Sequence, residues 1–513
     1  MILGQLAKRN AKRYPRKTGV VSGSVRLTFE EFNRRVNSLA NGLIDLGLRR
    51  EDRVAVLLDS SYQYLELYFA IPKAGGVVVP LNTALSVPEM AYILGHAGVE
   101  TLVFGERFEP VVDSLLNELD SVKRLVVVGT SAREVHSYEQ LVARYPSTEP
   151  EVEVGEQDVA YLIYTSGTTG MPKGIMETHR GIIESALNTI LGCRLSERDI
   201  GLVSTPLFWG AIMVSVVVPQ VYVGSTQVLA DDYSPEAILN LIQREKITSG
   251  FMIPPMITAL LECPQLDSYD TSSLRHVLFS GVPIGVETLK RAIKTFGNIF
   301  FQCYGTTELG PLTMIDPDGQ VIEGPPEKVR RLASCGQEAP NVEVRVVDDE
   351  GRDVAPGEVG EVIGRGDNLM KGYWHMPQAT EEALKGGYIH TGDLATVDEG
   401  GYLYLVGRKK DVIVSGGKTI YPVEVEEVIY QYPGVVEVAV IGVPDEKLGE
   451  SIRAVVVVRR GEKVAAEDIL EFCRQRLPDY ASPKSVAFVE KLPRNPAGKI
   501  LRRTLREEYG SGG

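Results

Sequence analysis

The chain has 513 residues, of which 44% are hydrophobic and 24% are charged, an ordinary globular composition whose length allows two or more domains. Its formal net charge of −14 argues against nucleic-acid binding as the main role, because proteins that bind nucleic acid are more often basic. A negative protein can still bind a nucleotide, since a local cluster of hydrogen-bond donors decides that.

The cysteines and the apolar runs limit where the protein acts. The five cysteines are scattered and form no CxxC spacing, so the sequence indicates neither a zinc site nor a disulfide framework, and we expect a cytoplasmic protein. No apolar run approaches the roughly 20 residues of a membrane span. Residues 1–9 lack the long apolar core of a signal peptide and are expected to form a short amphipathic helix.

The first two thirds of the chain alternate buried-type strands with helices. Thr28 and Glu31 have the spacing of a capping box and predict the start of one helix, and a second helix is predicted over residues 62–74. The strand-like apolar runs cover residues 54–58, 76–80, 102–104, 125–128, 200–203, 226–229, 247–253, 276–279 and 299–301. This alternation predicts parallel sheets covered by helices.

The stretch Tyr161–Gly174 starts as another strand and then becomes a loop of hydroxyls, glycines and one lysine. Glycines let backbone N–H groups converge on an anion, Ser and Thr add donors, and Lys173 adds a positive charge, so we predict that the loop holds phosphate. It is not a Walker loop, because Pro172 replaces the second glycine and Gly174 replaces the Mg²⁺-binding hydroxyl. The alternative is a flexible linker, which would not be fused to a buried-type strand.

Polar turns follow two of the later strands. Ser280–Pro283 lies between a strand and a helix, at the carboxyl edge of a parallel sheet, where ligands bind. Gln302–Glu308 offers an aromatic ring that can stack on a base, hydroxyls that can hold phosphate and a carboxylate that suits Mg²⁺. Taken singly, each of these segments can also be a structural turn.

The pattern changes after about Ala339. The alternating strand at residues 342–346 is typical of a half-solvated antiparallel sheet. A charged break at Gly407–Asp411 then precedes a small α+β region over residues 411–513.

Three polar residues in this part are ambiguous when each is taken alone. Asp393 follows a glycine and can accept both ribose hydroxyls, as acidic residues do in dinucleotide-binding folds, and Arg408 can hold the same sugar. Lys499 lies in a basic segment near the C-terminal end of the sequence. Each also fits a solvated surface charge.

In type and order, these segments resemble those of the adenylate-forming superfamily, which includes acyl-CoA synthetases, firefly luciferases and peptide-synthetase adenylation domains. The resemblance covers nearly the whole chain and is most specific at Tyr164–Gly174 and Tyr304–Glu308. It implies an α/β fold in which residues 1–408 form a large N-terminal domain of helix-covered sheets with a small antiparallel β-barrel-like subdomain. Residues 409–513 would form a mobile α+β lid that rotates.

The resemblance also implies a role for each matching residue. ATP would be held by Thr165, Ser166, Gly167, Thr168, Thr169, Gly170, Lys173, Gly281, Val282, Gln302, Cys303, Tyr304, Gly305, Thr306, Thr307, Asp393, Arg408 and Lys499. The catalytic residues would be Lys499, Glu308, Thr307 and Lys173, and the Mg²⁺ ligands would be Thr165 and Glu308. Lys410 would be the hinge, CoA would pass along Ser415, Gly416 and Gly417, and the acyl pocket would be lined by Trp209, Gly281, Val282 and Cys303.

Two positions in the implied acyl pocket depart from the family pattern. Trp209 stands where many relatives carry His, and Cys303 stands where several carry Gly. Such bulk favours a short to medium, branched or compact ring acid over a long straight chain. The alternative is that both residues only repack the wall.

The leading hypothesis is an ATP-dependent, AMP-forming acid–CoA ligase that makes an acyl-adenylate, releases pyrophosphate and then acylates the CoA thiol. The alternatives are an adenylating enzyme that loads a separate carrier protein, a luciferase-like oxygenase and a non-catalytic nucleotide-binding regulator, whereas Pro172 and Gly174 exclude a P-loop phosphotransferase. The expected ligands are ATP, Mg²⁺, CoA and a small carboxylic acid, with no nucleic acid. A homodimer is left open.

Overall fold

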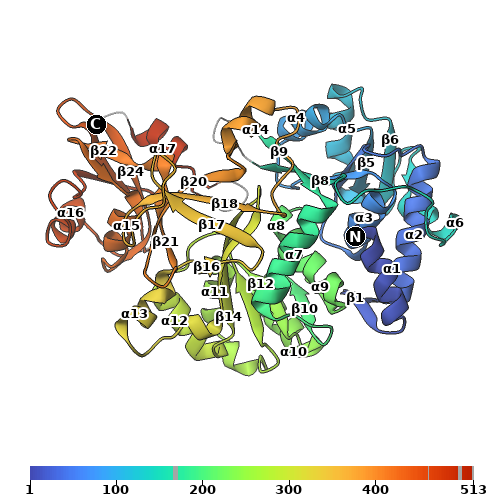
Figure 1. Ribbon diagram of the computed structural model, residues 1–513, viewed down its shortest axis with the longest axis horizontal. Coiled ribbons are helices and arrows are strands. Elements are labelled where there is room, and N and C mark those ends of the chain that lie inside the picture. Colours follow the sequence, from blue (N-terminus) through green and yellow to red (C-terminus); the bar gives the residue numbers. More distant parts are fainter. Residues whose placement is uncertain (166–170, 460, 495–499, 511–513) are drawn as a thin grey trace. The chain divides into compact units, whose positions relative to one another are not determined.

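The structure is a computed structural model that describes residues 1–165, 171–459, 461–494 and 500–510 (Figure 1). The predicted ATP-binding residues Ser166, Gly167, Thr168, Thr169, Gly170 and Lys499 lie outside the described residues. Contacts within the chain define two compact units. The first comprises Met1–Val344 and Gly364–Ile389, and the second comprises Arg345–Ile363 and His390–Gly513.

The first unit contains a seven-stranded sheet among its described residues, and the last two strands of this sheet flank the predicted phosphate loop. In spatial order the strands are β7 (His136–Ser137), β6 (Arg124–Val128), β5 (Thr101–Gly105), β3 (Arg53–Leu57), β4 (Val77–Pro80), β8 (Val159–Thr165) and β9 (Lys173–Thr178). Neighbouring strands run parallel except β8 and β9, which are antiparallel. The four apolar runs between residues 54 and 128 are confirmed as β3 to β6.

Helices cover this sheet, and the predicted helix starts are confirmed. They are α1 (Gly4–Arg13), α2 (Phe29–Asp45), α3 (Tyr62–Lys73), α4 (Val87–Ala97), the short 3₁₀ turn η1 (Glu106–Phe108), α5 (Glu109–Glu118) and α6 (Tyr138–Arg144). The Thr28 hydroxyl accepts a hydrogen bond from the Glu31 N–H, and the Glu31 carboxylate accepts one from the Thr28 N–H. Helices α1, α2 and α3 pack on one another (Figure 1). They contribute Leu6, Val36 and Tyr68 to the main hydrophobic core.

A nine-stranded sheet, counted over the described residues, forms the rest of the framework of the first unit. Its order is β16 (Gln337–Glu338), β15 (Gly310–Ile315), β14 (Phe300–Thr306), β13 (His276–Phe279), β12 (Ser249–Met252), β10 (Ile200–Val203), β11 (Thr226–Leu229), β1 (Thr18–Ser22) and β2 (Val25–Thr28). The strands from β14 through β1 run parallel. The turn that follows β13 lies at the carboxyl edge of the sheet, as predicted. The predicted turn at Gln302–Glu308 is wrong in its first part, because Gln302–Thr306 belong to β14 and pair with β15, and only residues 307–309 form the turn.

The helices around this sheet follow the predicted strand–helix alternation. They are α7 (His179–Cys193), α8 (Gly210–Ile212), α9 (Val218–Val223), α10 (Pro235–Glu245), α11 (Pro254–Leu261), α12 (Val286–Phe296) and α13 (Pro326–Arg330). The later helix α14 (Pro377–Ala383) contacts the short strand at Leu384–Lys385. A π-helical stretch, η2 (Met213–Val217), joins α8 to α9, and short 3₁₀ turns are η3 (Leu266–Ser268), η4 (Pro317–Gly319) and η5 (Arg331–Ala333).

None of the helices in the described part of the chain has the length and apolar character of a membrane span. All five cysteines are buried.

The remaining strands form a half-barrel sheet and the sheet of a separate C-terminal domain. The half-barrel contains β17 (Val342–Val347), β18 (Gly360–Gly366), β20 (Tyr388–Val397), β19 (Leu384–Lys385) and β21 (Leu403–Arg408). After the 3₁₀ turn η6 (Lys409–Asp411), the C-terminal domain contains β22 (Ile413–Ser415), β23 (Lys418–Ile420), α15 (Pro422–Tyr430), β24 (Val435–Asp445), β25 (Gly449–Val458), α16 (Ala466–Arg474), β26 (Ser485–Phe488) and α17 (Arg502–Tyr509). The predicted α/β fold with its half-barrel and α+β domain is confirmed.

His179 links the N-terminal segment to the end of β9. It is the first residue of α7 and follows Thr178, whose hydroxyl accepts a hydrogen bond from the Gly181 N–H. The buried imidazole accepts a hydrogen bond at Nδ1 from the Leu3 N–H, 3.2 Å away. Burial lowers the pKa of His179 to about 4, so the ring stays neutral at pH 7 and carries its proton on Nε2.

We predict that His179 destabilises the fold as the pH falls. The unfolded imidazole takes up a proton below its ordinary pKa of 6.5, whereas the folded one does so only near about 4, so the unfolding free energy decreases between these values. At about 1.4 kcal/mol per pH unit, the loss from pH 6.5 to 5 is about 2 kcal/mol. Urea unfolding at both pH values should show this loss in the wild type and not in His179→Asn, because Asn Oδ1 keeps the acceptor without titrating. An equal pH dependence in both proteins would contradict the prediction.

Candidate active site

The predicted phosphate loop joins two antiparallel strands. The register of β8 and β9 places Thr165 opposite Lys173 and Tyr164 opposite Gly174. A Walker loop leads from a strand into a helix, so the hairpin is a second reason, besides Pro172, to exclude one. A Cβ atom on Gly174 would lie 2.9 Å from Tyr164 Cζ, so only glycine lets the tyrosine ring pack this closely.

Residues Met370–Trp374, here called the edge segment, pair with β9 in antiparallel fashion. Three backbone hydrogen bonds join them, from Lys371 N to Met176 O, from Met176 N to Gly372 O and from Trp374 N to Gly174 O, at 2.9, 3.0 and 2.7 Å. The pairing places Tyr373 opposite Ile175. This residue was not among the predicted site residues, yet the pairing brings it to the start of β9.

Tyr373 connects two of the predicted catalytic residues. Its hydroxyl donates a hydrogen bond to Glu308 Oε1 at 2.9 Å, and the Lys173 ammonium lies 4.8 Å from the centre of its ring. Burial, followed by the charge of Glu308, raises the pKa of Tyr373, so the phenol remains a proton donor. Lys173 and Glu308 are far apart in the sequence, yet both contact the side chain of Tyr373.

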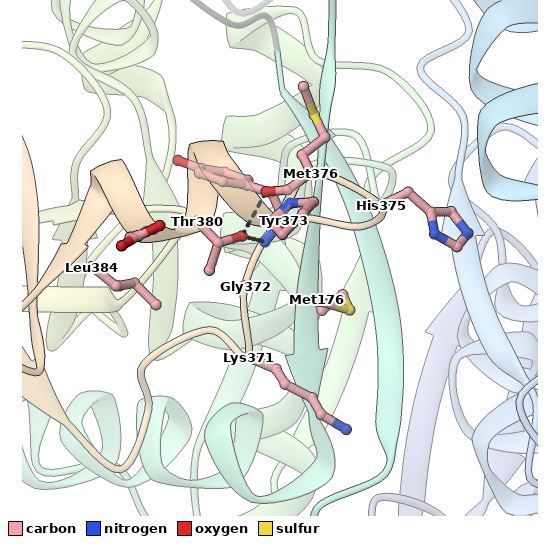
Figure 2. A pocket seen from close by; sticks show the side chains of 10 residues that line it. Met176, Lys371, Gly372, Tyr373, His375, Met376, Thr380 and Leu384 are labelled. Carbon is pink, nitrogen blue, oxygen red and sulfur yellow. Dashed lines mark hydrogen bonds between the residues drawn. The ribbon is translucent and has the colours of Figure 1, made fainter.

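An open pocket of about 510 Å³ borders the edge segment (Figure 2). Its lining includes Met176, Lys371, Tyr373, Met376, Thr380 and Leu384. Figure 2 shows the Thr380 hydroxyl between two backbone groups: it accepts a hydrogen bond from the Tyr373 N–H and donates one to the Met376 carbonyl, both at 2.9 Å. The backbone of Tyr373 is therefore fixed on the pocket side as well as by β9.

Glu308 lies in the tight turn between β14 and β15. A Cβ atom on Gly305 would lie 2.1 Å from the Gly310 carbonyl oxygen, so the two strands approach as closely as glycine allows. The Asn368 amide donates a hydrogen bond to the Leu309 carbonyl. The Glu308 carbonyl accepts a hydrogen bond from the edge segment at 2.8 Å. The turn that carries the predicted metal ligand is therefore held from several directions.

A second carboxyl group lies near Glu308. Glu177, at the end of β9, is only 3% exposed. Burial, and then the charge of Glu308, raises the pKa of Glu177 well above its ordinary value. Glu177 was not among the predicted site residues, because a glutamate in a strand usually faces solvent.

Three polar atoms of predicted site residues are buried and have no hydrogen-bond partner among the described residues. They are Gln302 Oε1, Thr306 Oγ1 and Trp209 Nε1. An unsatisfied buried polar group costs about 1–3 kcal/mol, so a ligand that pairs with these atoms would recover that cost. Two belong to the predicted ATP-binding turn and one to the predicted acyl pocket.

The predicted acyl-pocket residues Trp209 and Cys303 border one hydrophobic cluster of the first unit. Gly281 and Val282 follow β13. Gly281 has φ 97°, and a Cβ atom on it would lie 3.9 Å from the side chain of Ile253, which packs on the same cluster. Burial raises the pKa of the Cys303 thiol to about 12. Cys303 is therefore a protonated wall group and not a nucleophile.

The predicted ribose-binding residues are neighbours in the second unit. Asp393 on β20 is the cross-strand partner of Arg408 on β21, and Arg408 Nε lies 2.9 Å from Asp393 Oδ1. Asp393 is buried and its N–H donates a hydrogen bond to the Thr391 hydroxyl at 3.0 Å. The carboxylate is therefore fixed before any sugar binds.

The remaining predicted residues of the second unit lie in its turns. Lys410 is exposed in η6. Gly416 and Gly417 connect β22 to β23 with φ 56° and 73°, a two-residue hairpin turn that requires left-handed residues, and Ser415 precedes it as a buried residue. The exposed glycine turn leaves backbone open to an approaching ligand.

Known proteins match both parts of the chain. The family described as "AMP-binding enzyme" matches residues 7–374, and the family described as "AMP-binding enzyme C-terminal domain" matches residues 424–499. A feruloyl-CoA synthase from an Amycolatopsis species is 39% identical over 508 residues, 99% of both chains. A long-chain-fatty-acid–CoA ligase from Mycobacterium tuberculosis is 34% identical over 517 residues, again 99% of both. The ATP-bound crystal structure of MatB from Rhodopseudomonas palustris matches with a TM-score of 0.90 at 29% identity, covering 100% of this chain and 99% of its own.

The chain therefore belongs to the AMP-binding enzyme family. It is an AMP-forming acyl-CoA synthetase that uses ATP and CoA and activates a carboxylic acid as its adenylate. The predicted reaction is confirmed, and the alternative of loading a separate carrier protein is not favoured.

We predict that Gly305→Ala lowers the rate of pyrophosphate release about 100-fold. The added methyl group would collide with backbone rather than with a flexible side chain, so the β14–β15 turn must open and Glu308 must move. The control is Gly95→Ala in α4, where the nearest atom lies 3.6 Å from the new methyl group and activity should stay unchanged. Wild-type activity in a folded Gly305→Ala protein would show that this turn does not position Glu308.

Proposed function

We propose that this acyl-CoA synthetase holds MgATP between the predicted phosphate loop, which joins β8 to β9, and the turn that carries Glu308. We also propose that it acts on a short to medium, branched or compact ring acid. The main support is the contact chain from Lys173 through Tyr373 to Glu308. A metal–triphosphate needs a cation for its phosphate oxygens and a carboxylate for its metal, and this contact chain supplies both at one place.

The phosphate side is assigned as follows. Thr165, Lys173 and the loop residues 166–170 hold the β and γ phosphates, and Thr307 contacts the α-phosphate. Glu308 and Thr165 offer the oxygen ligands that Mg²⁺ prefers, and the fixed Glu308 turn fits that role. When bound, the metal offsets negative charge on the triphosphate.

The proposed nucleoside contacts come from the turn after β13, from strand β14 and from the pair β20–β21. Tyr304 stacks on the adenine, with Gly281, Val282 and the Gln302–Thr306 segment around it. The acceptor Gln302 Oε1 and the hydroxyl of Thr306 have no partner among the described residues, which supports polar contacts with the nucleotide. The Asp393 carboxylate accepts hydrogen bonds from the ribose hydroxyls. Arg408 orients that carboxylate and contacts the sugar.

Residues 409–513 form the proposed lid, which rotates about Lys410 between the two half-reactions. The boundary after Arg408 stays a prediction. Lys499 bridges the attacking carboxylate and the α-phosphate during adenylation, where charge develops in the transition state. After rotation, CoA passes along Ser415–Gly417, whose exposed glycine turn supports a close approach.

We predict that Lys499→Ala separates the two half-reactions. Formation of the acyl-adenylate should fall by at least about 100-fold, because the lysine acts on charge that develops only there. Conversion of supplied acyl-AMP and CoA to the thioester should stay near the wild-type rate. Lys491→Ala removes an exposed lysine upstream in the same segment and is the matched control. Equal losses in both half-reactions of Lys499→Ala would refute the assignment.

The acid class rests on the acyl pocket, because the relatives' names differ: one is a feruloyl-CoA synthase and another is a long-chain-fatty-acid–CoA ligase. Trp209 and Cys303 fill space on the same hydrophobic cluster, which supports a compact acid. Trp209 Nε1 is a buried donor without a partner among the described residues. An acid with an oxygen on its ring would accept a hydrogen bond from this N–H.

We predict that Trp209→Ala shifts the preference toward longer acids. Loss of the indole opens the pocket, so the ratio of kcat/KM for a long straight-chain acid to that for a compact ring acid should rise by about 10–100-fold. Pyrophosphate release with a panel of short, branched, aromatic and long-chain acids measures this ratio. The KM for ATP should stay unchanged and serves as the internal control. An unchanged acid profile would show that Trp209 only repacks the wall.

We also propose that the enzyme acts in the cytoplasm. The scattered spacing of its cysteines and their burial support a reducing compartment. A homodimer stays a prediction.

A further inference from the structure

We propose that Tyr373 is a positioning residue that restricts Glu308 to binding its divalent cation through one carboxylate oxygen, and that this restriction favours Mg²⁺ over Ca²⁺. The inference rests on the proposed role of Glu308 as a metal ligand. Neither the sequence motifs nor the assigned ATP-binding residues include Tyr373.

The hydrogen bond from Tyr373 makes the two oxygens of Glu308 unequal. Oε1 accepts the phenol hydrogen at a distance of 2.9 Å. A hydrogen bond to one carboxylate oxygen occupies one of its lone pairs and lowers its capacity to bind a cation. The other oxygen, Oε2, is therefore the better ligand.

Tyr373 cannot easily turn away from Glu308. Its backbone is fixed between β9 and Thr380, as Figure 2 shows for the Thr380 side. The Lys173 ammonium lies 4.8 Å from the centre of its ring, and Tyr373 is only 8% exposed. A binding cation would have to break the phenol hydrogen bond, or move the whole edge segment, to use both oxygens.

The two alkaline-earth cations respond differently to this restriction. Mg²⁺ is small, keeps several waters and typically takes one oxygen from a carboxylate. Ca²⁺ is larger, accepts six to eight ligands and often takes both oxygens of a carboxylate. A carboxylate with one oxygen already engaged thus suits Mg²⁺ and handicaps Ca²⁺.

The test is isothermal titration calorimetry of ATP binding in Mg²⁺ and in Ca²⁺, without acid or CoA, so that no turnover occurs. For the wild type, ATP should bind more tightly with Mg²⁺. In Tyr373→Phe, the ratio of the two Kd values should shift toward Ca²⁺ by about tenfold, the change expected on losing one hydrogen bond to a charged group. The phenylalanine ring keeps the contact with Lys173.

The matched control is Tyr145→Phe. Tyr145 also donates its hydroxyl to a carboxylate, that of Asp45, at the protein surface. Its loss should leave the Mg²⁺/Ca²⁺ ratio at the wild-type value. Thermal unfolding of both variants separates a stability effect from a metal effect, because a merely destabilised protein should lose affinity with both cations equally. A Tyr373→Phe protein that behaves in this way overturns the inference.

Glu308→Gln distinguishes this inference from the proposed function beneath it. If ATP binding depends on Mg²⁺ in the variant as strongly as in the wild type, Glu308 is not a metal ligand and both proposals fail. If Glu308→Gln abolishes the metal dependence while Tyr373→Phe keeps the wild-type cation ratio, only the role of Tyr373 fails.

Discussion

Backbone pairing between β9 and the edge segment is the interaction on which the proposed nucleotide site depends. Residues Met370–Trp374 are bonded to β9 on one side and to the Glu308 carbonyl on the other. Strand β9 belongs to the seven-stranded sheet, whereas Glu308 follows a strand of the nine-stranded sheet. Five residues thus align two sheets at the point where phosphate and metal are proposed to meet. Because main-chain groups make these bonds, the alignment is largely independent of side-chain identity.

Burial disfavours negative charge on two acidic groups of the first unit. It raises the pKa of Glu177 well above its ordinary value, with the charge of Glu308 as a further cause. Burial likewise keeps the thiol of Cys303 protonated. At the same time, Gln302 and Thr306 hold buried polar atoms without partners among the described residues. The free protein carries that cost in advance, which is the usual condition of a preorganised site.

The sequence predicted the strands, the capped helix and the polar turns, because burial runs, caps and glycine turns are local signals. It led to the proposal of Lys173 and Glu308 as site residues for the same reason. It could not locate Tyr373, which lies 65 residues after Glu308 and in a Lys-Gly-Tyr-Trp run without strand periodicity. Its position is set by pairing with β9, and such long-range pairing leaves no pattern in one sequence. Glu177 escaped because only the folded environment reveals that its side chain is buried.

The burial of all five cysteines has a practical consequence for testing the proposed rotation of the C-terminal lid. Buried thiols react slowly with thiol-directed reagents. A cysteine placed at an exposed position, such as Lys418 in β23, would therefore be labelled before any native cysteine. Engineered cysteines could thus carry fluorophores that test the proposed rotation, without first removing native cysteines that pack in the cores.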